Sequence, residues 1–280
     1  MKLATIRTVS GTSAAVVRGD ELIEIAGVPD VGALLAAPDW QSVATAADGA
    51  RHQAAAADLA PVVPHPGKIV CVGLNYRNHI KEMGRELPEF PTLFAKYPEA
   101  LIGPRDDIEL PAESDQVDWE AELAVVIGKP ARRVSEAAAA DHIAGYAVLN
   151  DVTMRDYQYR TPQWFQGKTW ENSTPFGPYL VTPDEFALGA ILRGQVDGRT
   201  VQEVPTSDLV FSPAQLVAYI STIFTLQPGD VIATGTPGGV GHARKPAEYL
   251  SDGNLLSTSI DGLGELQNRA VKVVDHAGAN

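Results

Sequence analysis

The chain has 280 residues, 45% apolar and 20% charged, so it can bury one large core, with or without a small extra domain. Its formal net charge of −13 and its pI of about 4.8 argue against nucleic acid or an anionic membrane as partners. Its single cysteine, Cys71, excludes an internal disulfide and lies in an apolar run typical of a buried packing residue. No signal peptide and no membrane-spanning run is evident, which makes the cytoplasm the expected location.

Residues 1–62 are expected to form a small N-terminal α+β domain. Its strands, separated by glycine-containing turns, are predicted at 2–8, 13–17 and 21–25. Its helices are predicted at 30–37 and 40–59. The proline-rich segment 61–67 is predicted to be a stiff linker, and residues 67–280 are expected to form the larger domain.

The larger domain is predicted to be mixed and mainly β. Its strands are predicted at 68–72, 92–96, 101–103, 108–111, 123–128, 145–149, 181–183, 191–196, 199–203, 231–234, 255–261 and 264–274. Its helices are predicted at 76–83, 135–144 and 212–224. Segment 85–91 has the composition of a lid, and residues 151–178 lack a regular pattern, which in a compact domain usually marks a functional loop.

A pair of glutamates precedes the most apolar predicted strand. Glu120 and Glu122 point to the same face of an extended chain, roughly 6–7 Å apart along the backbone, and need a positive partner there. Asp151 follows the next strand, and three hard oxygen ligands suit Mg²⁺ or Mn²⁺, with Ca²⁺ as an alternative occupant. For an E-x-E motif alone, a solvated edge strand is the preferred explanation, so the motif needs support from the rest of the chain.

Other polar residues each have a structural and a functional explanation. His79 alone is more often structural, but His79 and Glu82 share one face of the helix predicted there, where the carboxylate can control a histidine base. The turn at 234–241 either simply ends a strand or holds a carboxylate through its amides and the Thr236 hydroxyl. The remaining histidines receive no role, although His242 follows this turn closely enough to contact a substrate.

Five motifs, in order along residues 66–275, resemble the fumarylacetoacetate hydrolase family. They are GLNYRNHIKEM, VDWEAELAVVIGK, the D-x₆-Q spacing of Asp151 and Gln158, GKTWENSTPFGP and TGTPGGVG. The resemblance implies a β-sheet roll preceded by a small N-terminal domain, and typically a homodimer. It also implies that Glu120, Glu122 and Asp151 bind Mg²⁺ or Mn²⁺.

The resemblance further implies the roles of individual residues. His79 and Glu82 would activate water on a segment that orders over the substrate, and Lys168 would stabilise a developing enolate or oxyanion. Gln158, Gly235 and Thr236 would contact the substrate.

The expected reaction is cleavage of the C3–C4 bond of a 2,4-dioxo acid, an acylpyruvate such as fumarylpyruvate, to pyruvate and a carboxylic acid. The water activated by His79 would attack C4, and the metal and Lys168 would stabilise the pyruvate enolate. Decarboxylation of oxaloacetate-like acids and isomerisation of unsaturated 2-oxo diacids need the same site, and the fold does not separate the three reactions. An alternative of another class is a non-catalytic protein with a structural Ca²⁺ site, in which the protein would fill nearly every ligand position.

Overall fold

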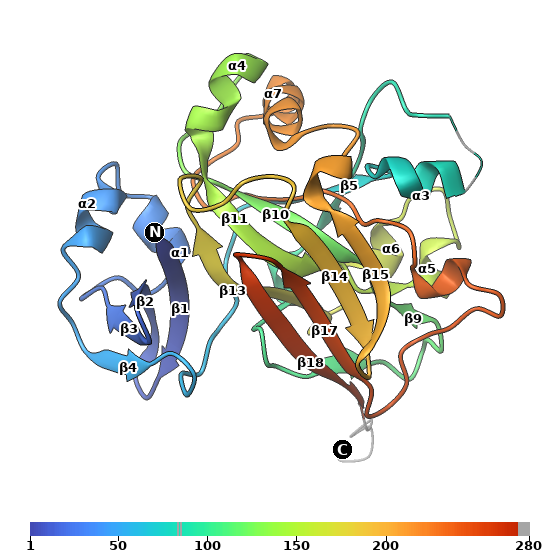
Figure 1. The fold of residues 1–280 in the computed structure, drawn as a ribbon, viewed down its shortest axis with the longest axis horizontal. Coiled ribbons are helices and arrows are strands. Elements are labelled where there is room, and N and C mark those ends of the chain that lie inside the picture. Colours follow the sequence, from blue (N-terminus) through green and yellow to red (C-terminus); the bar gives the residue numbers. More distant parts are fainter. Residues whose placement is uncertain (83, 85, 274–280) are drawn as a thin grey trace, which may run out of the picture.

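A computed structural model describes residues 1–82, 84 and 86–273, without the side chains of residues 79, 81 and 82. A long, mostly antiparallel sheet runs through the molecule, and a shorter sheet covers part of one face (Figure 1). Two helices, α4 and α7, lie above the long sheet (Figure 1). The predicted fold class, mainly β with α, is confirmed.

The long sheet has eleven strands among the described residues, in the order β4-β3-β2-β1-β13-β11-β10-β16-β5-β6, with β7 paired to β13. Its strands are β1 (Lys2–Thr8), β2 (Gly11–Arg18), β3 (Glu21–Glu24), β4 (Arg51–Gln53), β5 (Ile69–Gly73), β6 (Thr92–Lys96), β7 (Leu101–Ile102), β10 (Ala121–Ile127), β11 (Ile143–Asn150), β13 (Thr174–Val181) and β16 (Val231–Ala233). All seven residues of β10 are buried, as the apolar run in the sequence predicts.

The shorter sheet has the order β15-β14-β17-β18-β8. Its strands are β8 (Ile108–Leu110), β14 (Ile191–Val196), β15 (Arg199–Pro205), β17 (Leu255–Ile260) and β18 (Gly264–Lys272). A separate pair joins β9 (Val117–Asp118) to β12 (Thr153–Met154). Leu123 and Val148 of the long sheet pack with Leu192 and Leu266 of the shorter sheet, so the two sheets share an apolar core.

The α-helices are α1 (Val31–Leu35), α2 (Trp40–Thr45), α3 (Arg77–Glu82), α4 (Glu136–Ala139), α5 (Arg155–Gln158), α6 (Phe165–Lys168) and α7 (Pro213–Ile223). The 3₁₀ helices are η1 (Pro98–Ala100), η2 (Ala140–His142), η3 (Thr206–Asp208) and η4 (Gly241–Ala243). Helix α7 begins as the sequence predicts, because Ser212 and Gln215 form a capping box and Pro213 occupies its first turn. None of these helices is long and apolar enough to cross a membrane.

Four predicted elements are wrong. Of the strand predicted at 181–183, only Val181 belongs to a strand, as the last residue of β13. The helix predicted at 40–59 ends at Thr45, and β4 follows, because the alanine-rich sequence offers little apolar surface to bury. The helix predicted at 135–144 is shorter, since Ile143 and Ala144 already belong to β11. The stretch 151–178, expected to be irregular, contains α5, α6 and the first residues of β13, whose prolines and glycine conceal a strand pattern.

The N-terminal segment adds its strands to the long sheet rather than forming a sheet of its own. Lys2 and Leu3 of β1 pair with Val181 and Leu180 of β13. Leu3 also belongs to an apolar cluster with residues of both parts of the chain, among them Leu149 of β11. The boundary between residues 62 and 67 stays a prediction.

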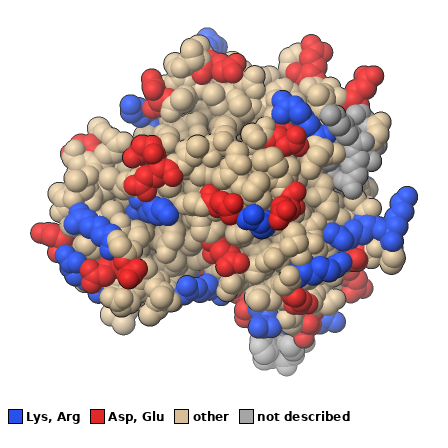
Figure 2. Space-filling model, viewed as in Figure 1, with Lys and Arg blue, Asp and Glu red and all other residues tan. Residues whose placement is uncertain are grey.

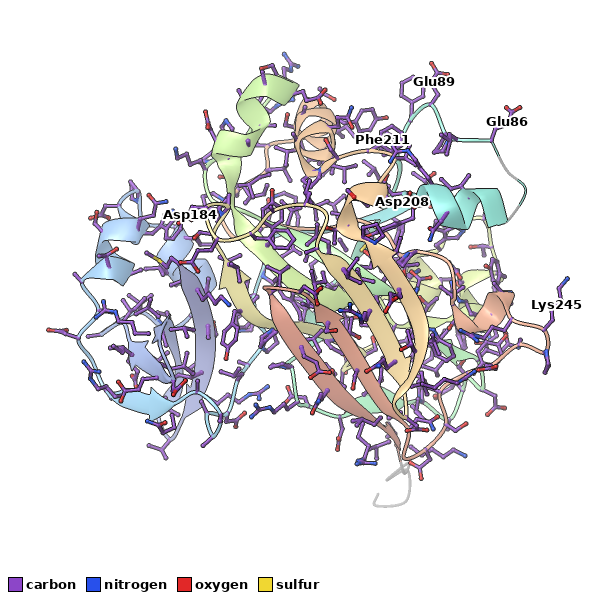
Figure 3. All side chains as sticks on the ribbon, viewed as in Figure 1. Glu86, Glu89, Asp184, Asp208, Phe211 and Lys245 are labelled. Atoms are coloured by element: carbon purple, nitrogen blue, oxygen red, sulfur yellow. The ribbon has the colours of Figure 1, made fainter. Side chains whose placement is uncertain are left out.

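Charged side chains of both signs are interspersed on the face shown in Figure 2. The segment after α3 carries Glu86 and Glu89 outward, and Lys245 projects from the loop after η4 (Figure 3). Helix α3 itself is anchored near its start, because Asp208 Oδ2 accepts a hydrogen bond from the Asn78 backbone N at 2.9 Å.

Candidate active site and metal centre

The register of two central strands brings the predicted metal ligands together. Ala121 of β10 pairs with Asn150 of β11, so Glu120 and Asp151 lie side by side just beyond the paired residues. The Asp151 backbone N donates to the Glu120 carbonyl at 2.9 Å, and the Asn150 amide oxygen accepts from the Glu120 backbone N at 2.9 Å. One carboxylate oxygen from each of Glu120, Glu122 and Asp151 lies within 4.8 Å of the others, and all three residues are buried.

Two buried lysines contact this carboxylate triad. Lys168 Nζ lies 2.7 Å from Glu120 Oε2 and 2.8 Å from Asp151 Oδ2, while Lys96 Nζ lies 2.7 Å from Asp151 Oδ1. Burial alone would raise the pKa of Asp151, but Lys168 and Lys96 outweigh it and lower that pKa. Glu122 differs, because burial and then the charges of Asp151 and Glu120 raise its pKa well above the usual range. The triad therefore still lacks positive charge beside Glu122.

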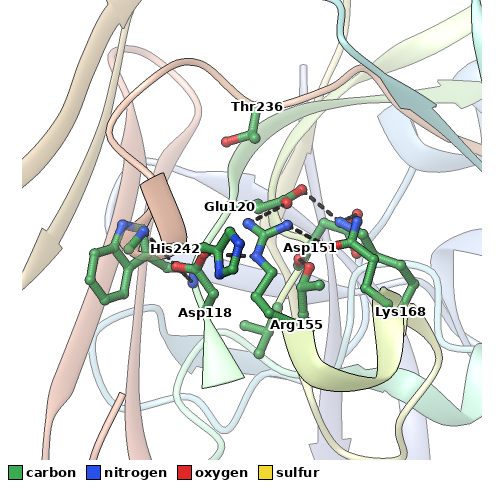
Figure 4. A network of polar contacts seen from close by, with 12 residues as sticks. Asp118, Glu120, Asp151, Arg155, Lys168, Thr236 and His242 are labelled. Atoms are coloured by element: carbon green, nitrogen blue, oxygen red, sulfur yellow. Dashed lines mark hydrogen bonds and ion pairs between the residues drawn. The ribbon is translucent and has the colours of Figure 1, made fainter. Parts of the chain in front are cut away.

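Arg155 links the triad to a fourth buried carboxylate. In Figure 4 its side chain lies between Asp118 and Glu120. Its Nε donates to Asp118 Oδ2 at 2.8 Å, and its Nη1 donates to the Gln158 side-chain oxygen at 2.8 Å. Its Nη2 lies 2.7 Å from Glu120 Oε1 in an ion pair, but without the angle of a hydrogen bond.

The charges of this cluster favour a divalent cation. Counted as formal charges, four carboxylates lie beside three cations, which leaves one excess negative charge among the described residues: Asp118, Glu120, Glu122 and Asp151 against Lys96, Arg155 and Lys168. Carboxylate oxygens are the ligands that Mg²⁺, Mn²⁺ and Ca²⁺ prefer. The residues therefore fit a divalent metal, and a bound cation would make the cluster net positive and attractive to an anionic substrate.

The glycine-rich turn supports the triad from the other side. The Gly235 amide donates to Glu122 Oε2 at 2.8 Å, and the Thr236 hydroxyl donates to the Ala121 carbonyl at 3.0 Å. Gly235 has φ of +100°, and a Cβ there would lie 2.8 Å from the Val72 carbonyl oxygen, so a larger residue would not fit. The amide that we expected to bind substrate at Gly235 therefore holds Glu122, and its substrate role stays a prediction.

A small pocket of about 260 Å³ opens beside the triad. Its charged lining comes from Glu120, Arg155 and Lys168, and Phe94 and Trp164 contribute aromatic walls. The predicted substrate contacts Gln158 and Thr236 also line it. Lys168 and Gln158 thus reach one cavity from two consecutive short helices, which explains their spacing in the sequence.

The side chains of the predicted base, His79, and its partner, Glu82, lie outside the described part of the structure. Their contacts therefore stay a prediction. Their helix, α3, begins three residues after Leu74, which lines the pocket together with Gly73.

The sequence did not indicate three residues of the site, Lys96, Asp118 and Arg155, and it indicated His242 only as a residue close enough to the turn to contact a substrate. Arg155 has the clearest signal in the sequence, because it lies between Asp151 and Gln158 in one of the five family motifs. Lys96 ends a correctly predicted strand, and nothing in the sequence shows that its ammonium group is buried against Asp151. Asp118 accepts hydrogen bonds from residues far away in the chain, which no local pattern indicates.

Gly167 is expected to be essential for the position of Lys168. A Cβ at Gly167 would lie 2.6 Å from Gln158 Cβ, from the Gln158 backbone N and from the Met154 carbonyl oxygen, so α5 and α6 would have to separate. Gly167→Ala should cost about 1–3 kcal/mol of unfolding free energy through overpacking and displace the lysine from the pocket. Thermal unfolding and activity assays check this, with the exposed neighbour substitution Gln166→Ala as control. Wild-type stability and activity in Gly167→Ala would contradict it.

The fold and the site define an enzyme with a buried, carboxylate-lined centre that can hold a divalent metal. The chain belongs to the fumarylacetoacetate hydrolase family, because residues 68–271 match the family model described as Fumarylacetoacetate (FAA) hydrolase C-terminal. The resemblance seen in the sequence motifs is therefore confirmed.

Relatives of this chain differ in the reactions that their names state. It is 41% identical to the mitochondrial oxaloacetate tautomerase fahd2 of Xenopus laevis over 82% of this chain and 74% of that protein. Among solved structures, fumarylacetoacetate hydrolase from Exiguobacterium antarcticum has a TM-score of 0.88 and 33% identity, covering 98% of this chain and all (100%) of that one. Maleylpyruvate hydrolase from Sphingobium sp. SYK-6 has a TM-score of 0.81 and 30% identity, with the same coverage of 98% and 100%.

Proposed function

We propose that this enzyme acts on a 2-oxo acid and stabilises the negative charge that develops when a bond at C3 of that acid breaks. The observation that carries the proposal is the buried Lys168 ammonium group, which lines the pocket while contacting both Glu120 and Asp151. A fixed cation in a site with little water stabilises developing charge far more strongly than it would in solution.

Lys168 is suited to donate hydrogen bonds as a fixed cation and unsuited to accept a proton. Burial would lower its pKa, but Asp151 and Glu120 overcome this effect and raise the pKa above its usual value. The ammonium group is therefore protonated at neutral pH and can hold the substrate's C1 carboxylate or the oxygen on C2. Glu120, Glu122 and Asp151 would hold Mg²⁺ or Mn²⁺, which when bound would act as a Lewis acid on those oxygens.

Within this chemistry, we propose keto–enol tautomerisation of a compact 2-oxo diacid of the oxaloacetate class. The C3–H bond breaks, its proton passes to a base, for which His79 is the candidate, and the oxygen on C2 gains a proton. The pocket volume of about 260 Å³ lies below the roughly 300–1,000 Å³ of sites for drug-sized ligands, which favours a small substrate. The two pocket cations, Arg155 and Lys168, match the two carboxylates of a diacid. The name of the Xenopus laevis relative agrees with this substrate class.

Hydrolysis of an acylpyruvate to pyruvate and a carboxylic acid is the second candidate. The sequence favours it through His79 and Glu82, because tautomerisation does not need an activated water. The name of the Sphingobium protein agrees with this alternative. Decarboxylation of oxaloacetate and isomerisation of unsaturated diacids remain further alternatives at the same site.

An assay of three reactions separates these candidates. With Mg²⁺, the protein should accelerate the interconversion of keto and enol oxaloacetate, measured by ultraviolet absorbance, with little release of pyruvate from oxaloacetate. Pyruvate release from acylpyruvates measures hydrolysis in parallel, with Mg²⁺ in buffer as the control. Rates equal to that control with every substrate would contradict the proposed function, and fast pyruvate release from an acylpyruvate alone would favour the hydrolase.

Other properties expected from the sequence stay proposals. We infer a homodimer with a small 2-oxo acid as its ligand, in the cytoplasm and without nucleic-acid or membrane partners. The net charge of −13 supports the last point, because it would repel polyanions.

A further inference from the structure

His242 stands at the mouth of the pocket, in a position fixed by the same carboxylate that orients Arg155. Its backbone N donates to Asp118 Oδ2 at 2.9 Å, and the neighbouring Gly241 N donates to Asp118 Oδ1 at 2.7 Å. Arg155 Nε donates to Asp118 Oδ2 as well. Because Asp118 is fully buried, it holds η4 and the guanidinium in one fixed relation.

Two tyrosines contact the His242 ring, and its Nε2 is available for a ligand. Its Nδ1 lies 2.9 Å from the Tyr249 hydroxyl, and its ring lies 5.1 Å from the Tyr159 ring, centroid to centroid, at an interplanar angle of 33°. Within the part of the chain that the structure describes, His242 Nε2 has no hydrogen-bond partner. Figure 4 shows the imidazole beside the guanidinium of Arg155.

Arg155 has a nitrogen that is paired in charge but lacks a hydrogen bond. The residue is 4% exposed and lines the pocket, and its Nη2 lies 2.7 Å from Glu120 Oε1 in an ion pair without hydrogen-bond geometry. A ligand oxygen at this place could accept the hydrogen bond that Glu120 does not. Burial and then Arg155 lower the pKa of His242, which favours the neutral imidazole. Nε2 donates a hydrogen bond in the tautomer whose Nδ1 accepts from the Tyr249 hydroxyl.

We propose that His242, together with Arg155, binds a carboxylate at the end of the substrate that lies away from the metal triad, and so makes the enzyme selective for 2-oxo diacids. The inference rests on the proposed function, because it assumes that the other end of the 2-oxo acid lies at Glu120, Glu122 and Asp151. Lys168 serves that first end, Arg155 lies between the two ends because its Nη2 also contacts Glu120, and His242 serves the distal end.

Two four-carbon acids test this selectivity. Oxaloacetate carries a distal carboxylate, whereas 2-oxobutyrate ends in a methyl group at the same position. Binding of each to the Mg²⁺-loaded protein is measured by calorimetry or by competition with oxalate. His242→Phe keeps an aromatic ring beside Tyr159 and removes Nε2, so oxaloacetate should bind about tenfold or more weakly, as expected for a lost hydrogen bond to a charged group. Binding of 2-oxobutyrate and oxalate should change less than about threefold, within the effect of a neutral contact.

Matched variants separate recognition from structural damage. His65→Phe alters an exposed histidine that does not line the pocket and should leave both affinities unchanged. His242→Gln restores a side-chain donor and should recover part of the oxaloacetate affinity. An equal loss for both acids, or no loss for either, in His242→Phe would overturn the inference while leaving the proposed function intact. Failure of wild-type protein to bind either acid or oxalate would overturn the proposed function itself.

Discussion

Removal of divalent cations should lower turnover by about 10³-fold or more, because a metal Lewis acid contributes several kcal/mol to stabilising developing charge. Mg²⁺ or Mn²⁺ should restore activity after chelation. We expect the metal to bind at the carboxylate triad, because one oxygen from each residue lies within 4.8 Å of the others in a buried site. Full activity after exhaustive chelation would contradict the prediction that the site binds a catalytic metal.

Glu122→Gln tests the same site without relying on activity. The amide keeps the size of the side chain and can still accept from the Gly235 N, but it loses the charge that a cation needs. Mg²⁺ or Mn²⁺ should raise the melting temperature of wild-type protein, since a ligand at a hundred times its Kd stabilises by about 2.7 kcal/mol. Most of that metal-induced shift should disappear in the variant.

A matched control uses Glu113→Gln, which removes a charge from an exposed residue outside the triad. This control should keep the wild-type shift. Metal-free Glu122→Gln should be no less stable than metal-free wild type, because burial and neighbouring carboxylates already disfavour the charged glutamate. A wild-type metal shift in Glu122→Gln would show that Glu122 is not a ligand.

His79→Ala should reduce acylpyruvate hydrolysis by about 10²–10⁴-fold if His79 is the base that activates water. Metal affinity should hardly change, because neither His79 nor Glu82 is a proposed ligand. Decarboxylation of oxaloacetate needs no nucleophilic water and no base at C3, so its rate should depend less on His79. The informative measurement is therefore the ratio of the two rates in wild type and in His79→Ala, since a general effect on pocket closure would slow both.

Two further variants refine this test. Glu82→Gln should lower hydrolysis more mildly if Glu82 mainly orients the imidazole, and Glu86→Gln, at an exposed position on the following segment, should have no effect. Helix α3 is anchored by Asp208 near its start, so an alanine at position 79 should leave the helix in place. An unchanged ratio in His79→Ala would show that His79 does not activate water.

The sequence by itself determined the strands that build the centre of the molecule and the identity of the carboxylate triad. Apolar runs that end at glycines or polar residues mark β5, β10, β11 and β16 because burial of such a run is a local property of the chain. Alternation along the extended chain that enters β10 places Glu120 and Glu122 on one face, so their spacing alone predicts that both carboxylates reach the same site. The same local signals failed at β13, where prolines and a glycine interrupt the pattern of a buried strand.

Only the tertiary structure decided which charges surround that triad and what the glycine-rich turn does. Lys96 lies 55 residues before Asp151 in the chain, and Asp118 meets His242 from 124 residues away, through contacts made by sheet pairing and turn geometry. The Gly235 amide, expected at the substrate, is used by Glu122 instead. A sequence records which residues can carry charge, but pKa values and selectivity depend on distances of a few ångströms across strands, and these are set by the packing of the whole sheet.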